Sequence, residues 1–387
     1  MQTVALGVYL TETTHNPVWL GLLTVAAWSP ALVGSPLGGV VADRWNRQRW
    51  IQVNNAIMAA TASTLAAAEL THHLSPQLAC YLAFGEGLAG SAAWSAWQSL
   101  LPDLVERDEV LSAVSLSSAQ FNLGRIIGPM LAGIALAFGS PGLCFAINAA
   151  SFVFVIVMFS FVRTPPRTKP TSKVHLWTET VFGAKRAWAV VGCRYPILGV
   201  GTIALLASPF IALVPAMAIQ TLHAGRAGVS WLVVAQGVGA VLGALTLPSL
   251  ARRTSRLAVL RGSTVVIVVA LALYGVAPNL AFAVAALVVL GGAYVGTLTG
   301  LNTAVQLHAP LSERSRILSL YTLSLSIFYP IGALVQASLA KIWGVRMVTL
   351  SGAVLLAVIF ILVTLLQPRY WAEIGSTPNS VPILLAE

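Results

Sequence analysis

Charged side chains are scarce in this sequence, and their scarcity excludes a soluble globular protein. Only 9% of the 387 residues are Asp, Glu, Lys or Arg, 57% are hydrophobic, and the mean hydropathy is +0.83. A soluble domain carries about 25% charged residues, because its surface must face water. A chain of this length with so little charge cannot cover itself with polar groups, so we expect its solvent to be lipid.

Signatures of enzymes and of metal sites are also missing. The three cysteines, Cys80, Cys144 and Cys193, show no Cys-x-x-Cys spacing, which argues against a disulfide framework or a zinc site. The histidines fall in loops or near the ends of apolar stretches, and neither a Gly-x-Ser-x-Gly elbow nor a Walker-type phosphate loop occurs. We therefore predict no enzyme activity, no cofactor, no bound metal and no ATP-driven transport by this chain alone.

Long apolar runs fill most of the chain. A helix needs about 20 apolar residues to span a bilayer. The sequence holds eleven such stretches, at residues 17–42, 50–70, 78–101, 112–138, 141–162, 196–220, 229–250, 257–276, 280–305, 315–340 and 345–367. Val4–Leu10 is apolar but only half a span long, and residues 11–16 after it resemble a loop. With no basic segment before it and no cleavage signature after it, we interpret it as a shortened first helix rather than a signal peptide.

Basic residues lie on alternate loops. Of the 22 lysines and arginines, 18 fall in one set of loops, which includes residues 43–49, residues 163–195 and the tail, and the other set holds only Arg226, Lys341 and Arg346. Cytoplasmic loops are enriched in such residues, so we predict that the first set and the C-terminus face the cytoplasm from the plasma membrane. Because the blocks form no continuous basic face, the net charge of +10 does not indicate nucleic-acid binding.

The longest loop divides the spans six and six. We expect a helix bundle in residues 1–162, a cytoplasmic linker with an amphipathic helix in 163–195, a second bundle in 196–367 and a cytoplasmic tail in 368–387. Weak matches between the halves, Gln98 with Gln306 and Arg44 with Arg252, share an offset of 208 residues. Duplicated six-helix halves are a transporter architecture. The sequence thus predicts an all-α membrane protein of two six-helix bundles with pseudo-twofold symmetry.

One loop carries a recognisable motif. Gly39, the pair Asp43-Arg44, and then Arg47 with a further arginine closely resemble the signature loop of the major facilitator superfamily. Asn46 stands where many members have Gly, a change that a left-handed backbone tolerates. Membrane anchoring by positive charge explains the arginines but not the aspartate. The resemblance implies a cytoplasmic gate, in which the aspartate pairs with arginines or with a helix N-terminus of the opposite half.

A second motif lies in residues 112–138. Gly124, Gly128, Pro129 and Gly133 partly resemble the helix-5 motif of facilitator-type antiporters, which marks exporters more often than importers. Glycines allow helices to approach closely, and an internal proline can bend a helix. Ordinary helix packing would explain the same residues.

Two charges are predicted inside the membrane. Glu86 is the only acid well inside a predicted span, and Arg125, with Asn122 one turn before it, lies in the next span. Intramembrane charges are costly, by at least about 2.5–3.5 kcal/mol each, and usually face a cavity or each other. Glu86 is a candidate proton carrier, since burial favours the neutral form of a carboxyl group, and Arg125 would control it. The alternative is a static buried ion pair.

A broader resemblance suggests the function. Residues 98–105 (QSLLPDLV), 113–116 (AVSL), 122–129 (NLGRIIGP) and 145–149 (FAINA) resemble the branch that holds enterobactin-type siderophore exporters and drug:proton antiporters. The resemblance implies export of an amphipathic small molecule, a siderophore or a drug, in exchange for protons by alternating access. The expected partners are that substrate, protons and the lipid bilayer, with a monomer as the default. An importer on the same fold, a membrane protein without transport, and a chain inactivated by its short first helix remain as alternatives.

Overall fold

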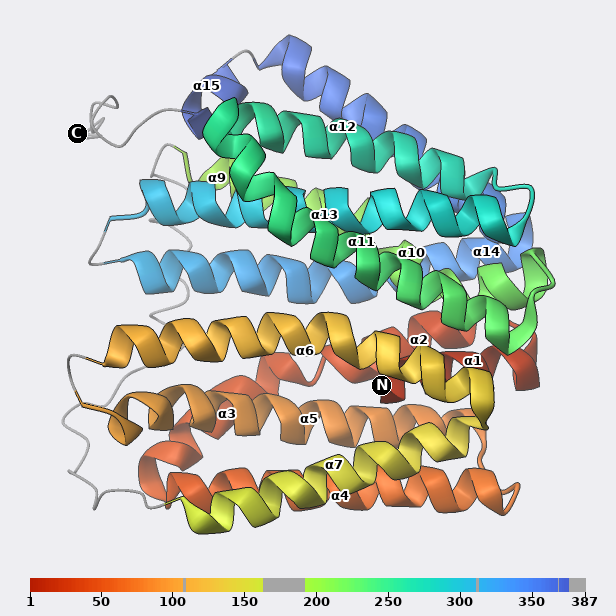
Figure 1. The fold of residues 1–387 in the computed structure, drawn as a ribbon, viewed down its shortest axis with the longest axis vertical. Helices are drawn as coiled ribbons and strands as arrows, with labels where there is room; N and C mark the ends of the chain where they lie inside the picture. The colour runs from red at the N-terminus through yellow and green to blue at the C-terminus, as the bar shows by residue number, and fades with distance from the viewer. Residues whose placement is uncertain (107–108, 163–191, 311–312, 368, 376–387) are drawn as a thin grey trace. The chain divides into compact units, whose positions relative to one another are not determined.

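The computed structural model describes residues 1–106, 109–162, 192–310, 313–367 and 369–375, and every element in these ranges is a helix (Figure 1). The prediction of an all-α protein is confirmed. The expected amphipathic helix of the linker lies outside the described residues. The chain divides into two compact units: unit 1 comprises Met1–Lys173 and Ala212–Val234, and unit 2 comprises Val174–Ile211 and Ala235–Glu387. The proposed domain boundaries at residues 162 and 196 stay predictions.

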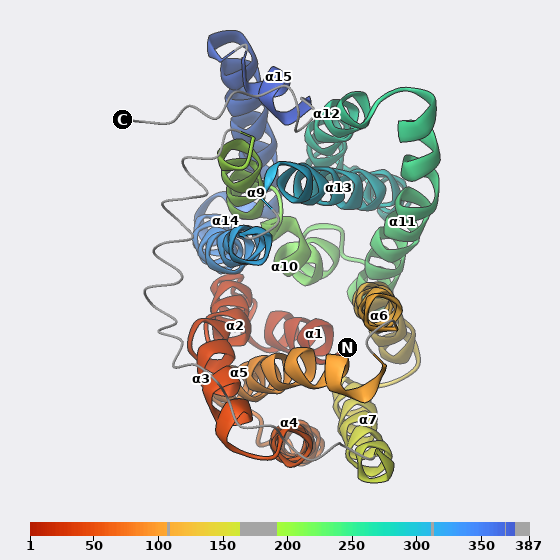
Figure 2. The ribbon, with the colours of Figure 1, turned by 90° about the vertical axis from the view of Figure 1, so that its left-hand side faces the viewer.

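Unit 1 is built around one long helix. Its first-half elements are α1 (Gln2–Thr14), α2 (Val18–Trp28), α3 (Ala31–Arg44), α4 (Arg47–Leu70), α5 (Pro76–Leu100), the 3-10 turn η1 (Leu101–Leu104), α6 (Val110–Phe138) and α7 (Pro141–Phe161). Helix α5 packs against α1, α2, α3 and α4, while α7 packs along α4. The view along the helices in Figure 2 shows α5 among α1, α3 and α4. Helix α5 is therefore enclosed by other helices on several sides.

The end of α1 corrects an expectation. Residues 11–14 were predicted to be a loop, but α1 continues to Thr14 and ends at His15, whose φ is 50°. The hydroxyls of Thr11, Thr13 and Thr14 donate to the carbonyl oxygens of the residues four positions earlier. Threonines beside a charged residue are typical of a loop. Their hydroxyls can, however, donate hydrogen bonds to the preceding helical turn, and the residues then remain within the helix.

The predicted span at 17–42 is two helices that meet at Pro30, whose ring nitrogen cannot donate a hydrogen bond. Helix α3 then lies very close to α5. A Cβ added at Gly38 would sit 2.5 Å from Ala92 Cα, and one at Gly34 would sit 2.9 Å from the Leu88 carbonyl oxygen. Only glycine allows this approach, so these residues fix α3 against α5.

The remaining helices continue in order along the chain. They are α9 (Arg194–Leu206), α10 (Pro209–Ala216), the π-helical turn η2 (Met217–Thr221), α11 (Gly225–Arg253), α12 (Arg256–Gly275), α13 (Leu280–His308), α14 (Arg314–Leu366) and α15 (Arg369–Gly375). Within α14 the backbone of Gly344 has φ 80° and ψ 156°, so two helices join there. They correspond to the predicted spans at 315–340 and 345–367.

The described helices suit a lipid environment. Seven of the described segments are long and apolar enough to cross a membrane, and one of these, Ile317–Leu366, contains both helices of α14. Large apolar side chains point outward on many helices; Phe138 is 88% exposed and Leu116 is 73% exposed. Such a surface would be unfavourable in water. The chain is a multi-pass membrane protein, and the predicted total of twelve helices is supported roughly.

Candidate functional site

A polar cluster joins three helices of unit 1. The Gln2 side-chain amide on α1 donates a hydrogen bond to Glu86 Oε2 on α5. The Asn148 side-chain amide on α7 donates to Gln2 Oε1 over 2.8 Å. Gln2 is 4% exposed, and the Glu86 side chain is partly buried. The three groups form one chain of hydrogen bonds that ends on a carboxyl group.

The Glu86 carboxyl group of this cluster can change its charge. A carboxylate accepts hydrogen bonds only, whereas a protonated carboxyl group can also donate one. The amides of Gln2 and Asn148 offer both donors and acceptors, so they can adjust to either form of Glu86. Among the described residues no group of three or more His, Cys, Asp or Glu is arranged to hold a metal ion.

Arg125 and Asn122 lie on α6, as the sequence indicates, but their side chains fall outside the described part of the structure. Their proposed role beside Glu86 stays a prediction. Sequence reasoning identified neither Gln2 nor Asn148 as a partner of Glu86. A polar residue at the buried start of an apolar helix was the available signal for Gln2.

The signature loop connects α3 to α4. Arg44 is exposed at the end of α3, and the side chain of Asp43 lies outside the described part of the structure. Asn46 has φ −68° and ψ 115°, and its Oδ1 accepts from the Arg49 backbone N–H at 3.0 Å. The residue is thus the N-cap of α4, not a left-handed substitute for glycine. A Cβ at Gly39 would meet nothing within 4 Å, so packing does not require glycine there.

Arg47 forms the contacts of this loop that sequence reasoning did not anticipate. Its Nη1 donates to the Ser99 carbonyl oxygen over 2.8 Å and forms an ion pair with Asp103 in η1. The Arg47 side chain is 22% exposed and that of Asp103 is 50% exposed. Asp103 stands within the 98–105 stretch that carries the family resemblance, and this was the signal that could have identified it.

The motif in α6 that resembles the helix-5 motif of antiporters contains both closely packed and open glycines. A Cβ at Gly133 would lie 3.1 Å from the Ser230 carbonyl oxygen at the start of α11, whereas one at Gly124 would meet nothing within 4 Å. A Cβ at Gly128 would make only ordinary contact at 3.8 Å, and Pro129 lies inside α6. Close helix approach therefore explains Gly133 but not the other two glycines.

Comparison with known sequences gives matches over the whole chain. A family model described as "Transmembrane secretion effector" matches residues 1–382. Enterobactin exporter EntS of Citrobacter koseri is 27% identical over 385 residues, which are 98% of this chain and 91% of that protein. The protein of the same name from Escherichia coli is 26% identical over 387 residues, which are 98% of this chain and 90% of that one.

Solved transporter structures share the fold at low sequence identity. A bacterial homolog of the human lysosomal transporter Spinster matches with a TM-score of 0.72 and 15% identity, covering 97% of this chain and 96% of that one. The nucleoside transporter NupG matches with a TM-score of 0.69 and 16% identity, covering 92% and 93% of the two chains. The Escherichia coli fucose:proton symporter FucP gives a TM-score of 0.56 at 14% identity, over 97% and 96%.

Proposed function

Because this chain belongs to the transmembrane secretion effector family of major facilitator transporters, we propose that it exports an amphipathic small molecule across the plasma membrane in exchange for protons. Membership makes it a membrane transporter and not an enzyme. The direction, the protons and the class of substrate are the proposed part. A siderophore or a drug is the class we propose, since the relatives are named as exporters of a siderophore.

The observation that carries proton coupling is the position of Glu86. Its carboxyl group lies on the central helix of unit 1, in contact with the Gln2 amide and through it with Asn148. Desolvation favours the neutral form of a buried carboxyl group, while amide donors favour the charged form. A carboxyl group between these opposing influences can bind a proton in one state of the transporter and release it in the other.

Arg125 and Asn122 on the adjoining span are proposed to complete this site. A guanidinium group that comes near Glu86 favours its charged form, and withdrawal of the guanidinium lets a proton bind. Opening and closing of the bundles would then set the protonation of Glu86. In the same scheme an anionic group of the substrate can replace Glu86 as the partner of Arg125.

The cytoplasmic end is proposed to close through Asp43, Arg44 and Arg47. Arg47 supports this role by fixing the start of α4 to Asp103 and to the Ser99 carbonyl oxygen. Export is supported by the Gly128-Pro129 pair with Gly133 in α6, because this motif resembles that of facilitator-type antiporters. Gly133 brings α6 against the start of α11, a segment from the second half of the sequence.

The test has two stages. The chain is expressed in an efflux-deficient host, and siderophores, macrolides, tetracyclines and dyes are screened for lowered accumulation. The substrate found is then followed in inverted and right-side-out vesicles with an imposed pH gradient. We expect uptake into inverted vesicles driven by an acidic interior. Accumulation in right-side-out vesicles driven by an acidic exterior would instead indicate an importer on the same fold and would overturn the proposed direction.

Two glutamate substitutions test the coupling. Glu86→Gln keeps the shape and hydrogen-bonding capacity of the side chain but cannot titrate, so we expect it to lose the dependence of transport on the pH gradient. Glu106→Gln is the matched control, because Glu106 is exposed in the segment after η1. A Glu86→Gln variant whose transport keeps the pH dependence of the unmodified protein would overturn the coupling role.

A further inference from the structure

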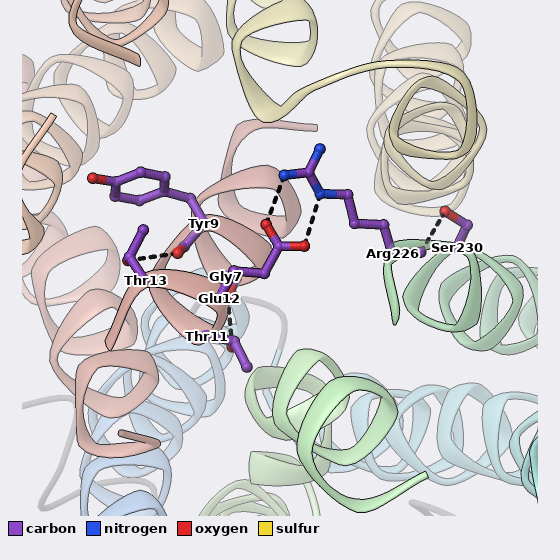
Figure 3. A network of polar contacts seen from close by, with 7 residues as sticks. All are labelled: Gly7, Tyr9, Thr11, Glu12, Thr13, Arg226 and Ser230. Carbon is purple, nitrogen blue, oxygen red and sulfur yellow. Dashed lines mark hydrogen bonds and ion pairs between the residues drawn. The ribbon is translucent and has the colours of Figure 1, made fainter. Parts of the chain in front are cut away.

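An ion pair joins residues from the two halves of the sequence. Arg226 Nε donates to Glu12 Oε1 over 2.7 Å, and Arg226 Nη2 donates to Glu12 Oε2 over 2.8 Å. Figure 3 shows the guanidinium group facing the carboxylate with two parallel contacts. The partners are 214 residues apart, yet both belong to unit 1. Such bidentate pairs are the most directional that arginine makes.

Both charges stand at the unfavourable end of their helix. Glu12 lies in the last turn of α1, where the helix dipole disfavours an anion, and Arg226 lies in the first turn of α11, where it disfavours a cation. Each residue therefore costs its own helix some stability. The pairing of the two charges offsets that cost, which explains why both charges occupy these positions.

The orientation predicted from sequence places this pair on the outer side. Arg226 is one of three basic residues in the loops that we expect to be extracellular, where the positive-inside tendency gives no reason for one. Another of the three, Arg346, donates from Nη2 to the Ala277 carbonyl oxygen over 2.8 Å and so bonds within unit 2. Arg226 is thus the outer arginine that connects to the first half of the sequence.

Close packing also joins the segment that carries Arg226 to first-half helices of the same unit. A Cβ at Gly7 of α1 would lie 3.0 Å from Pro215 Cγ, and one at Gly133 of α6 would lie 3.1 Å from the Ser230 carbonyl oxygen. Ser230 is 6% exposed and lies one turn beyond Arg226. The segment that carries Arg226 therefore meets two first-half helices near the pair.

The segment that leads to Arg226 contains several breaks in regular helical geometry. Helix α9 ends at Leu206, α10 begins at Pro209 and contains Pro215, and a π-helical turn follows at Met217–Thr221. His223 and Gly225 then have positive φ angles of 51° and 59°. Prolines and π-turns interrupt the regular hydrogen bonding of a helix and mark the points where it can bend.

We propose that Glu12 and Arg226 form an outer latch, which holds the extracellular side closed in one access state and must separate in each transport cycle. The inference rests on the proposed alternating-access transport. The side chains of Arg226 and Glu12 are 41% and 28% exposed, so water screens their attraction. An exposed ion pair shifts an equilibrium by up to about fivefold. A latch of this strength biases the closed state yet still opens.

The latch is tested by chemical access to a buried position beside it. Ser230→Cys is introduced into a chain whose Cys80, Cys144 and Cys193 are replaced by alanine, and intact cells are treated with a membrane-impermeant maleimide. We expect Glu12→Gln and Arg226→Gln each to raise the labelling rate of Cys at position 230 about two- to fivefold. Arg346→Gln is the matched control and should leave the rate unchanged.

The exchanged pair, Glu12→Arg with Arg226→Glu, distinguishes the ion pair from a general loss of packing. The exchange puts each charge at the favourable end of its helix, so the pair should re-form and labelling should return to the original rate. Single Gln substitutions that label no faster than Arg346→Gln would overturn the proposal. So would an exchanged pair that labels as fast as the single variants, or labelling that occurs only from the cytoplasmic side.

The carboxylate of Glu69 on α4 is the other charge to be considered, since it also acts on Arg226. Glu69→Gln should therefore raise labelling less than Glu12→Gln, and an equal or larger effect would contradict the assignment of Glu12 as the partner. The labelling readout needs neither a substrate nor a pH gradient. Its failure is therefore separate from a failure of the coupling test on Glu86.

Discussion

Two arginine–carboxylate pairs among the described residues of unit 1 lie at opposite ends of its helices, and they differ in what they connect. Arg47 and Asp103 are 56 residues apart, and both come from the first half of the sequence. Glu12 and Arg226 are 214 residues apart and come from different halves. The first pair joins helices that already share a hydrophobic cluster of Ala42, Ile51, Ala96 and Leu100.

This difference predicts different roles for similar chemistry. The pair of Arg47 and Asp103 strengthens one bundle and can stay formed while the bundles move. The pair of Glu12 and Arg226 ties a first-half helix to a second-half segment of the same unit, and under the proposed latch it breaks when that segment moves away from α1. We call Arg47 and Asp103 the inner pair and Glu12 and Arg226 the outer pair, after the orientation predicted from the sequence. The inner pair should therefore affect mainly stability, and the outer pair mainly the rate of conformational exchange.

The largest effect should come from the packing of α3 against α5 in unit 1, and not from either ion pair. Valine at Gly38 would force a Cβ to within 2.5 Å of Ala92 Cα, so α3 and α5 would have to separate. Overpacking of this kind costs about 1–3 kcal/mol and sometimes more. We expect Gly38→Val to lose most of its folded protein in detergent, measured by size-exclusion chromatography after heating.

Gly39→Val is the matched control for that change, because its Cβ would enter space with no atom within 4 Å. It should elute and resist heating as the unmodified chain does. Equal losses at Gly38 and Gly39 would mean that the close approach of α3 to α5 is not what requires glycine.

Next in size is the inner pair. Arg47→Gln removes both the ion pair and the hydrogen bond to the Ser99 carbonyl oxygen, whereas Asp103→Asn removes only the charge. Partly exposed ion pairs contribute about 0.2–1 kcal/mol. We expect a small fall in thermal stability for each variant, larger for Arg47→Gln, and a double variant no less stable than Arg47→Gln. Strictly additive losses would show that the two side chains do not interact.

The outer pair should give the opposite pattern. Glu12→Gln and Arg226→Gln should leave the thermal midpoint almost unchanged, because each charge is unfavourable to its own helix. Transport should change by about two- to fivefold, as the balance of access states shifts by the strength of an exposed pair. A lowered thermal midpoint with unchanged transport would assign this pair a purely structural role and remove the contrast with Arg47 and Asp103.

The smallest effect concerns a thiol at the start of α9. Cys193 is fully buried, and this burial raises the pKa of its thiol to about 12, whereas a free cysteine has a pKa of about 8.5. The raised pKa keeps the thiol neutral at pH 8, so reaction with a maleimide should be slow there and should accelerate as the pH rises toward the pKa. Rapid labelling of Cys193 at pH 8 would contradict its burial.

Much of the fold could be predicted from the lengths of the apolar stretches, because a bilayer fixes how many apolar residues a span needs. The helix breaks inside these apolar stretches were harder to predict. Pro30 and Pro209 lie at breaks inside the predicted spans at 17–42 and 196–220, and the span lengths alone do not reveal these breaks. The helical turn at residues 11–14 was missed because its threonines bond to the preceding turn, which composition does not reveal.

The site was less predictable than the fold. Glu86 could be singled out because an acid inside an apolar span is costly. Its partners could not, since Gln2 and Asn148 reach it from α1 and α7, which the sequence does not place beside α5. Arg226 was visible as an exception among the outer loops, but its pairing with Glu12 depends on tertiary structure. The pairing of Asp103 with Arg47 depends on it in the same way.

The central claim is that Glu86 carries the proton that drives export, and proton movement tests it most directly. Purified protein is reconstituted in liposomes that contain a pH-sensitive dye, and a substrate gradient is imposed without a pH gradient. The unmodified chain should move protons against the direction of substrate flow, whereas Glu86→Gln should still carry substrate downhill without moving protons. Proton movement by Glu86→Gln equal to that of the unmodified chain would contradict the account.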